Sequence, residues 1–336
     1  GLNPDLVMHG GGNTSVKVER TNLFGETEYV LHVKGSGWDL DTLEAPGLPG
    51  VRLDPLYKLR ALSKLSDEDM VNVQRNNLLD SSSPNPSVET LLHAFLPHKF
   101  VDHTHATPFL ILANLPNARE VCREIFGDKL AVVPYIMPGF ALAKKAVQVF
   151  EKDPTVEGLL LLNHGHFAFG QTAKQSYEKI VEHTNAVAHY FKLKKSTSIG
   201  ERRPAKDIHF LPALRGLIAE VTLPKEAPMP ILNLRNHKNV ISFFKRKDLS
   251  LLEKRGMASP DHVLRTKGKP LFLRSADLTT AGIRKKLLAF KSSYEKYFER
   301  QSNKISEPKK ILAADPKHAW IENIGVLGIG VSAKAA

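Results

Sequence analysis

Two histidines, His103 and His105, are separated by one residue in the segment 101–105. Alternate residues of a β-strand project from the same face, so both imidazoles can point into one cavity. His164 follows the apolar run 159–162, and Glu89 lies a short way upstream of the histidine pair. Three imidazoles can hold a metal ion such as Zn²⁺ and leave a coordination position open for substrate. The pattern therefore predicts a metal site.

A glycine-rich segment, 10–15, reads Gly-Gly-Gly-Asn-Thr-Ser and separates two strand-like stretches, 6–8 and 16–18. Glycines allow close approach of the backbone to a ligand, and the polar residues that follow offer side-chain donors. The spacing fits neither a P-loop nor a dinucleotide-binding loop. A plain hairpin and an anion-binding turn remain equal alternatives. A second small polar turn, 35–37, follows a predicted strand.

The elements that must position these residues are predicted from apolar periodicity. Helices are expected at 54–65, 88–96, 107–114, 117–126, 141–151, 176–195, 207–221 and 276–301. Strands are expected at 29–34, 100–105, 130–133, 158–162, 231–234, 271–273 and 319–331. The polar stretch 194–206 is the predicted linker, which divides the chain into a catalytic domain, 1–200, and a basic C-terminal extension, 205–336. No internal repeat is expected.

Composition is that of a globular protein, with 42% hydrophobic and 24% charged residues in 336. No apolar run reaches the roughly 20 residues that a membrane span needs, so no membrane partner is expected. A single cysteine, Cys122, excludes an intrachain disulfide and favours a reducing, cytoplasmic location. The chain opens with Gly1 rather than Met, so we expect that its natural start lies elsewhere.

The net charge of +12 is concentrated in residues 192–310, which hold 28 Lys and Arg against 11 Asp and Glu. These cations are dispersed among apolar residues and form no known nucleic-acid-binding signature. We therefore expect a solvated basic surface, or one that attracts an anionic substrate or an acidic partner, and no nucleic-acid partner.

Four motifs together resemble the class II aldolase/adducin family. They are Gly-Gly-Asn-Thr-Ser at 11–15, Ser-x-Glu at 87–89, His-x-His at 103–105 and Asn-His-Gly at 163–165. The stretch 259–267 is similar to the branch in which a rhamnulose-1-phosphate aldolase is fused to a short-chain dehydrogenase. The resemblance implies an α/β fold with a central, mainly antiparallel sheet flanked by helices, followed by an α+β extension.

The resemblance also implies a role for individual residues. His103, His105 and His164 would be the zinc ligands, and Glu89 the general acid/base. The substrate's phosphate would be bound by Gly12, Asn13, Ser36, Gly37 and Ser87. Phosphate-using members commonly have a second serine before the glutamate, and this chain has Val88 there.

Four further residues are candidates with open alternatives. Tyr135 is the nearest counterpart of the tyrosine that some members use as a proton donor. His93 lies one helical turn after Glu89, either as a structural residue or as a partner behind the site. His262 and Arg265 either close over the active site or hold the C-terminal extension together.

The predicted activity is the cleavage of a ketose 1-phosphate, rhamnulose 1-phosphate or a similar sugar, to dihydroxyacetone phosphate and an aldehyde. Such a reaction passes through an enediolate, whose negative charge a bound divalent cation stabilises as a Lewis acid while a carboxylate moves the proton. A pentulose-5-phosphate 4-epimerase and a non-catalytic, adducin-like scaffold are the alternatives. The family resemblance implies a homo-oligomer, often a tetramer. The sugar and the identity of the divalent ion are left open by the sequence.

Overall fold

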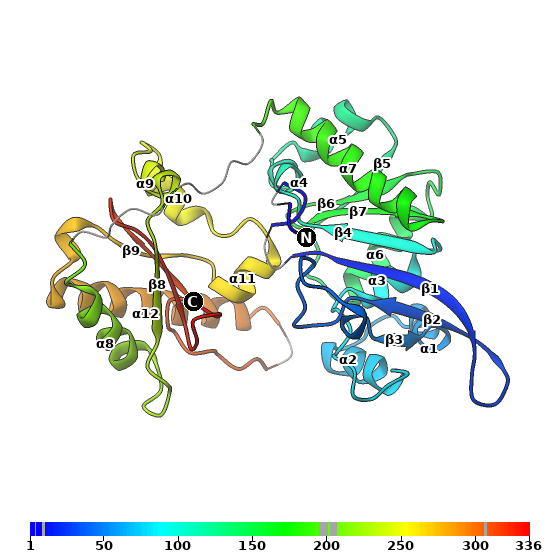
Figure 1. The fold of residues 1–336 in the computed structure, drawn as a ribbon, viewed down its shortest axis with the longest axis horizontal. Helices are drawn as coiled ribbons and strands as arrows, with labels where there is room; N and C mark the ends of the chain where they lie inside the picture. The colour runs from blue at the N-terminus through cyan, green and yellow to red at the C-terminus, as the bar shows by residue number, and fades with distance from the viewer. Residues whose placement is uncertain (4, 9–10, 195–200, 202–206, 306–307) are drawn as a thin grey trace. The chain divides into compact units, whose positions relative to one another are not determined.

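The computed structural model of the protein (Figure 1) describes residues 1–3, 5–8, 11–194, 201, 207–305 and 308–336. The chain divides into two units: 1–196 with 258–261, and 197–257 with 262–336. The predicted linker at 194–206 lies almost entirely outside the described residues, so the boundary at 200–205 stays a prediction. No described helix is both long enough and apolar enough to cross a lipid bilayer.

The first unit is built on a seven-stranded sheet. Its strands are β1 (Asn13–Thr21), β2 (Thr27–Val33), β3 (Gly50–Arg52), β4 (Phe100–Thr104), β5 (Leu130–Val133), β6 (Gly158–Leu161) and β7 (Gly165–Gly170). Their order in the sheet is β3-β2-β1-β4-β7-β6-β5. Every neighbouring pair is antiparallel except β5 and β6. The predicted α/β class with a mainly antiparallel sheet is confirmed.

Helices cover both faces of this sheet. They are α1 (Leu53–Lys58), α2 (Asp67–Asn76), α3 (Thr90–Phe95), α4 (Thr107–Ala113), α5 (Ala118–Phe126), α6 (Phe140–Phe150) and α7 (Ala173–Tyr190). Along β6, Leu159 and Leu161 join the core with α1, α2, α3 and α6, whereas Leu160 joins the core with α4, α5 and α7. The strand is apolar throughout because both of its faces are buried.

Strand β4 lies at the centre of the sheet, between β1 and β7. His103 is opposite Asn13 on one side and Phe167 on the other. Strand β7 was not predicted: its sequence, Gly-His-Phe-Ala-Phe-Gly, has neither polar alternation nor the continuous apolar run that indicated β6. The strand expected at 6–8 is wrong, because residues 5–8 form a turn and irregular chain and β1 begins at Asn13.

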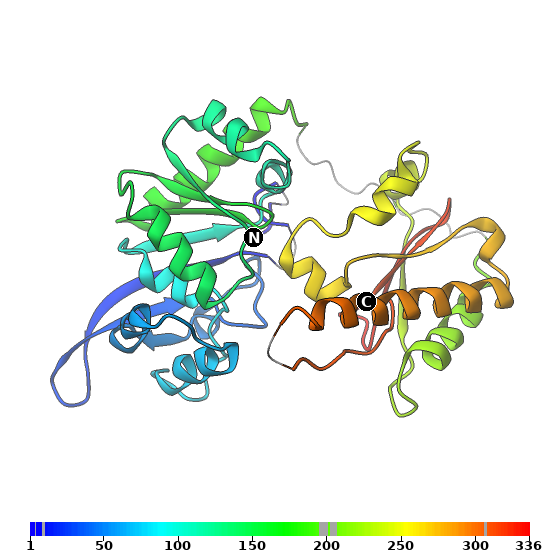
Figure 2. The same cartoon turned by 180° about the vertical axis from the view of Figure 1, so that it is seen from behind.

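The second unit contains a four-stranded sheet with strands β8 (Ile231–Arg235), β9 (Leu271–Leu273), β10 (His318–Ile321) and β11 (Gly325–Gly330). Its helices are α8 (Leu211–Thr222), α9 (Lys238–Phe243), α10 (Leu249–Arg255), α11 (Pro260–Thr266) and α12 (Thr280–Ser302). Apolar residues of α8 and α12 form one core with the sheet, and Figure 2 shows α12 running across it. The expected α+β extension is confirmed, although the strand predicted at 319–331 is a hairpin of β10 and β11.

The second sheet repeats half of the first. Its order, β8-β11-β10-β9, matches β4-β7-β6-β5, with the same parallel pair and the same two antiparallel pairs. In both hairpins a three-residue turn has Asn in the left-handed region, Asn163 at φ 55° and Asn323 at φ 62°. The sequences 163–174 and 323–334 share Asn-x-Gly, a later Gly, and Thr or Ser followed by Ala-Lys. The expectation of no internal repeat is therefore wrong.

Candidate metal centre

Three buried imidazoles meet in the first unit. His103, His105 and His164 each offer one ring nitrogen, and these nitrogens all lie within 4.8 Å of one another. His103 lies on β4, and His105 is the first residue after that strand ends. His103 and His105, two residues apart and on the same side of the chain, therefore supply two nitrogens, and His164 in the turn between β6 and β7 supplies the third.

The orientation of His103 is fixed from behind. Its Nδ1 lies 2.9 Å from the carbonyl oxygen of His166, so Nδ1–H donates and the lone pair of Nε2 faces the cluster. The ring also stacks on Phe167, with centroids 4.1 Å apart and planes 13° from parallel. Burial lowers the pKa of His103 to about 4, so the imidazole is neutral at pH 7 and can act as a ligand.

The Asn-His-Gly motif forms the tight turn that delivers His164. Asn163 adopts φ 55°, its backbone N–H donates to the carbonyl of Ala113, and its side chain donates to Asn114. A Cβ on Gly165 would lie 2.8 Å from the carbonyl oxygen of Thr104 and 2.8 Å from the His105 ring. Only glycine permits this approach, so the motif packs the turn against the end of β4.

Glu89 faces the three imidazoles from the N-cap position of α3. Its Oε1 lies 3.1 Å from Nε2 of His164, and its Oε2 lies 3.5 Å from Nε2 of His103. The side chain is 7% exposed. Burial by itself raises the pKa of Glu89, but the surrounding imidazoles favour the carboxylate and hold the pKa well below its ordinary value. Glu89 is therefore ionised at neutral pH.

A chain of buried polar side chains holds Glu89 in place. The amide Nδ2 of Asn13 donates to Glu89 Oε2 at 2.7 Å and to the hydroxyl of Ser87 at 3.1 Å. Asn13 Oδ1 accepts a hydrogen bond from Nε2 of His93, and Nδ1 of His93 lies 2.7 Å from the hydroxyl of Ser15. Burial lowers the pKa of His93 to about 3, so this imidazole is neutral.

The Asn13–His93–Ser15 connection was missed from the sequence. Asn13 and Ser15 are two apart on β1 and share one face, as do the histidines on β4. The two-residue spacing of Asn13 and Ser15 can be read from the sequence. No sequence pattern near His93 indicated that its ring would lie between these two side chains. His93 therefore stands behind the site and bonds to a residue that contacts Glu89.

The donor set fits a divalent metal ion. Nε2 of His103 and Nε2 of His105 are 2.9 Å apart, and two imidazole lone pairs at that distance repel unless a proton or a cation lies between them. Tetrahedral coordination at the usual Zn–N distance of about 2.0–2.1 Å would separate two ligand nitrogens by roughly 3.3 Å. The 2.9 Å separation of this pair is close to that value, and all three nitrogens lie within 4.8 Å of one another.

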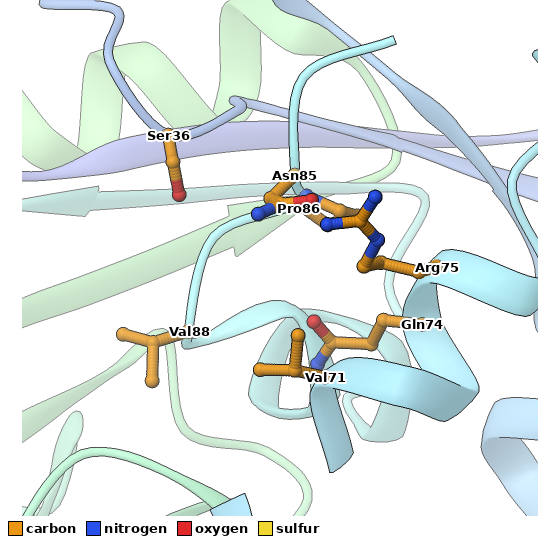
Figure 3. A pocket seen from close by; sticks show the side chains of 7 residues that line it. All are labelled: Ser36, Val71, Gln74, Arg75, Asn85, Pro86 and Val88. Carbon is orange, nitrogen blue, oxygen red and sulfur yellow. The ribbon is translucent and has the colours of Figure 1, made fainter. Parts of the chain in front are cut away.

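The residues predicted to bind phosphate are distributed around the site. Gly12 has φ 85°, and a Cβ there would lie 2.5 Å from the carbonyl oxygen of His103, so this glycine serves close packing against β4. Asn13 and Ser87 point their side chains toward each other and toward Glu89. Ser36 and Gly37 form the exposed turn after β2. Ser36 also lines a small cavity between α2 and the loop that precedes Glu89 (Figure 3). The roles of all five residues in phosphate binding stay predictions.

The remaining candidates come from other elements of the chain. Tyr135 is in the irregular segment after β5, and 53% of its surface is exposed. His262 and Arg265 are on α11 and belong to the second unit. Their proposed roles at the metal centre therefore stay predictions.

The second unit does not repeat the cluster. In β8, Leu234 pairs with Leu327 as His103 pairs with Phe167, which places Asn236 at the position of His105. Ile324 follows Asn323 as His164 follows Asn163. Leucine and isoleucine offer no ligand atom. Among the described residues, His103, His105 and His164 are the one group of three or more His, Cys, Asp or Glu side chains that could hold a metal ion together.

Known protein families account for both units. The model of the class II aldolase and adducin N-terminal domain matches residues 3–191, and that of the class II aldolase second domain matches residues 205–336.

Individual relatives resemble parts of the chain. An uncharacterized oxidoreductase of Bacillus subtilis, YuxG, is 32% identical over 96% of this chain and 48% of its own length. The chain thus spans about half the length of this curated relative. The N-terminal class II aldolase domain of a conserved Thermoplasma acidophilum protein is 39% identical, with a TM-score of 0.53 over 56% of this chain and 87% of that one. An L-fuculose-1-phosphate aldolase from Thermus thermophilus is 15% identical, with a TM-score of 0.35 over 55% and 84%.

The N-terminal family model covers more than half of the chain, and the Thermoplasma domain is similar to the first unit in both sequence and fold. The motifs at 11–15, 87–89, 103–105 and 163–165 converge on one buried centre in this fold. The chain belongs to the class II aldolase and adducin family.

Proposed function

We propose that the first unit is a divalent-metal-dependent aldolase that cleaves a ketose 1-phosphate, such as rhamnulose 1-phosphate, to dihydroxyacetone phosphate and an aldehyde. The observation that carries this proposal is the buried cluster of three imidazole nitrogens within 4.8 Å, with the Glu89 carboxylate 3.1 Å from one of them. Membership of the family supports the lyase class.

His103, His105 and His164 would hold the ion. When bound, a divalent cation supplies Lewis-acid stabilisation for the negative charge that develops on the ketose oxygens. Neutral imidazoles do not cancel the charge of the cation, and burial excludes water that would compete for it.

Glu89 would carry the proton. As a carboxylate it can accept the proton of the C4 hydroxyl, whereupon the C3–C4 bond breaks to leave an aldehyde and an enediolate. Returning that proton to C3 yields dihydroxyacetone phosphate and restores the carboxylate, so the proton count balances. The Asn13 amide donates a 2.7 Å hydrogen bond to Oε2 of Glu89, and the other carboxylate oxygen, Oε1, faces His164. Glu89 thus has a fixed direction for transfer.

The test combines metal analysis with a substrate panel. Protein purified without added metal should contain about one divalent ion per chain, and ketose 1-phosphates should release dihydroxyacetone phosphate. Absence of a stoichiometric ion would contradict any metal-dependent enzyme on this site and favour a scaffold. Interconversion of pentulose 5-phosphates without aldehyde release would identify an epimerase instead.

Glu89→Gln separates the acid/base role from metal binding. The amide keeps the size and polarity of the side chain but cannot take up the proton, so turnover should fall by about 10²–10⁴-fold while metal content is unchanged. Turnover equal to that of the unsubstituted protein would remove Glu89 from its assigned role.

A further inference from the structure

The two ring nitrogens of His105 have different neighbours. Nε2 lies 2.9 Å from Nε2 of His103 and therefore faces the cluster of imidazoles. Nδ1, the other ring nitrogen, lies 3.1 Å from Oδ2 of Asp261. An N–H···O hydrogen bond can span that distance. A carboxylate thus lies beside the nitrogen of His105 that is not directed at the cluster.

A short segment of the chain, 258–261, carries this carboxylate. These four residues belong to the first unit, whereas the chain immediately before and after them belongs to the second. Asp261 itself is the second residue of α11. The first unit therefore receives a residue that is separated from His105 by more than the whole of β5, β6, β7 and α7 in the sequence.

Asn114 attaches this segment to the turn that carries His164. Its Nδ2 donates to the carbonyl oxygen of Ala258 at 3.0 Å, and its Oδ1 accepts from Nδ2 of Asn163 at 3.1 Å. Asn163 directly precedes His164 in the Asn-His-Gly turn. One side-chain amide therefore links the segment of Asp261 to the turn that supplies another nitrogen of the cluster.

Close packing fixes the plane of the His105 ring. A Cβ on Gly11 would lie 2.2 Å from Nδ1 of His105, and a Cβ on Gly165 would lie 2.8 Å from its Cδ2. The main chain therefore closes on the ring at two places, and the ring is fully buried. Packing does not determine which ring nitrogen carries the proton, because the two tautomers have nearly the same shape.

A hydrogen-bond partner does determine the tautomer. A neutral imidazole has one N–H group and one nitrogen lone pair, and an ionised carboxylate only accepts hydrogen bonds. Asp261 therefore favours the proton on Nδ1 of His105 and leaves the lone pair on Nε2. His103 is oriented in the same way by a weaker acceptor, the carbonyl oxygen of His166, 2.9 Å from its Nδ1. A carboxylate also makes the imidazole a more basic ligand.

We propose that Asp261 is a positioning residue of the metal centre. Its carboxylate accepts the Nδ1 proton of His105 and directs the Nε2 lone pair toward the divalent ion. Asp261 acts through His105 and not on the substrate. The proposal rests on the proposed metal-dependent function, but metal affinity can be measured without turnover.

The test is the dissociation constant of Zn²⁺ from the full chain, measured by competition with a chromophoric chelator. Asp261→Ala should weaken zinc binding by about 10–100-fold. Asp261→Asn should weaken it as well, because its amide N–H₂ can donate to Nδ1 and place the proton of His105 on Nε2. Asp261→Glu should restore much of the affinity, since it keeps the carboxylate and the side chain of Asp261 is 37% exposed.

Asp54→Asn is the matched control. Asp54 is the exposed second residue of α1, as Asp261 is the second residue of α11, and the substitution removes the same charge. Its zinc affinity should equal that of the unsubstituted protein. Equal dissociation constants for Asp261→Asn and Asp54→Asn would overturn the proposal.

Imidazole N–H resonances give a readout that a purely structural role of Asp261 would not produce. In zinc-loaded protein with ¹⁵N-labelled histidine, Asp261→Ala should shift the Nδ1–H signal of His105. The Nδ1–H signal of His103 should stay in place, because its acceptor is the carbonyl of His166. An unchanged His105 signal, or equal shifts of both signals, would contradict the assigned role.

Failure of this proposal can be told apart from failure of the proposed function. Zinc binding that does not depend on Asp261, in a protein that cleaves a ketose 1-phosphate, would refute the positioning role and leave the aldolase intact. Zinc binding that depends on Asp261, in a protein that cleaves no ketose 1-phosphate, would refute the aldolase alone. An unsubstituted protein that binds no divalent ion would refute both.

Discussion

The side-chain amide of Asn13 donates a 2.7 Å hydrogen bond to Oε2 of Glu89, across 76 residues of sequence. Asn13 lies on β1 and Glu89 precedes α3, so this bond joins the edge of the glycine-rich turn to the carboxylate of the metal centre. Both side chains are buried, at 4% and 7% exposure, which makes the bond strong and its loss costly.

Asn13→Ala tests the importance of this bond. Without the amide, Glu89 Oε2 loses its partner and the carboxylate can rotate, so kcat should fall by about 10–100-fold with metal content unchanged. Thr14→Val is the control, because Thr14 is the neighbouring residue on the opposite face of β1 and bonds to Asp102 instead. A rate for Asn13→Ala equal to that of Thr14→Val would show that the bond does not support turnover.

His105→Ala tests the metal centre. Removal of one imidazole from a three-histidine set should lower the bound metal from about one equivalent per chain to a small fraction. His189→Ala is the control, since His189 is exposed on α7. Metal content measured by elemental analysis should separate the two variants. An unchanged metal content in His105→Ala would place the ion elsewhere.

Lys17→Met tests how α3 is anchored. The ammonium of Lys17 donates to the carbonyls of His93, Leu96 and His98 at 2.8, 2.5 and 2.8 Å, and so satisfies the C-terminal end of the helix that follows Glu89. Methionine keeps the aliphatic packing but donates no hydrogen bond. The free energy of unfolding, measured by urea denaturation, should fall by about 2–4 kcal/mol.

The control for Lys17→Met is Lys58→Met, at an exposed position in the last turn of α1. Its free energy of unfolding should change by less than about 0.5 kcal/mol. If the two variants unfold at the same urea concentration, the three carbonyls do not depend on Lys17.

His98 makes stability depend on pH. Burial lowers the pKa of His98 from its ordinary 6.5 to about 4, and the ring stacks on Phe169 with centroids 4.0 Å apart. The unfolded chain therefore binds a proton that the folded chain excludes between pH 6.5 and about 4. The neutral His98 ring therefore contributes fully to the free energy of unfolding above pH 6.5. This contribution is lost as the pH falls toward 4.

His98→Phe should keep the stacking and remove this titration. Proton uptake on unfolding at pH 5, obtained from the slope of unfolding free energy against pH, should decrease by up to about one proton, or 1.36 kcal/mol per pH unit. An unchanged slope would mean that His98 titrates alike in the folded and unfolded chains.

Much of the fold was predictable because local pattern determines it. Most predicted helices and strands exist within a few residues of their expected bounds, because apolar periodicity is a local property of the sequence. Strand β7 escaped prediction because Gly165, His166 and Gly170 leave only a short apolar run in its sequence. The repeat escaped because its shared residues are few and confined to one turn.

The sequence by itself determined which residue types could bind a metal and that His103 and His105 share one strand face, because strand alternation is a local property. Only the tertiary structure decided that Glu89 faces them, that Asn13 holds Glu89, and that Asp261 lies beside His105. These relationships join segments far apart in the chain. They depend on how strands register and how helices pack on the sheet, which no local pattern encodes.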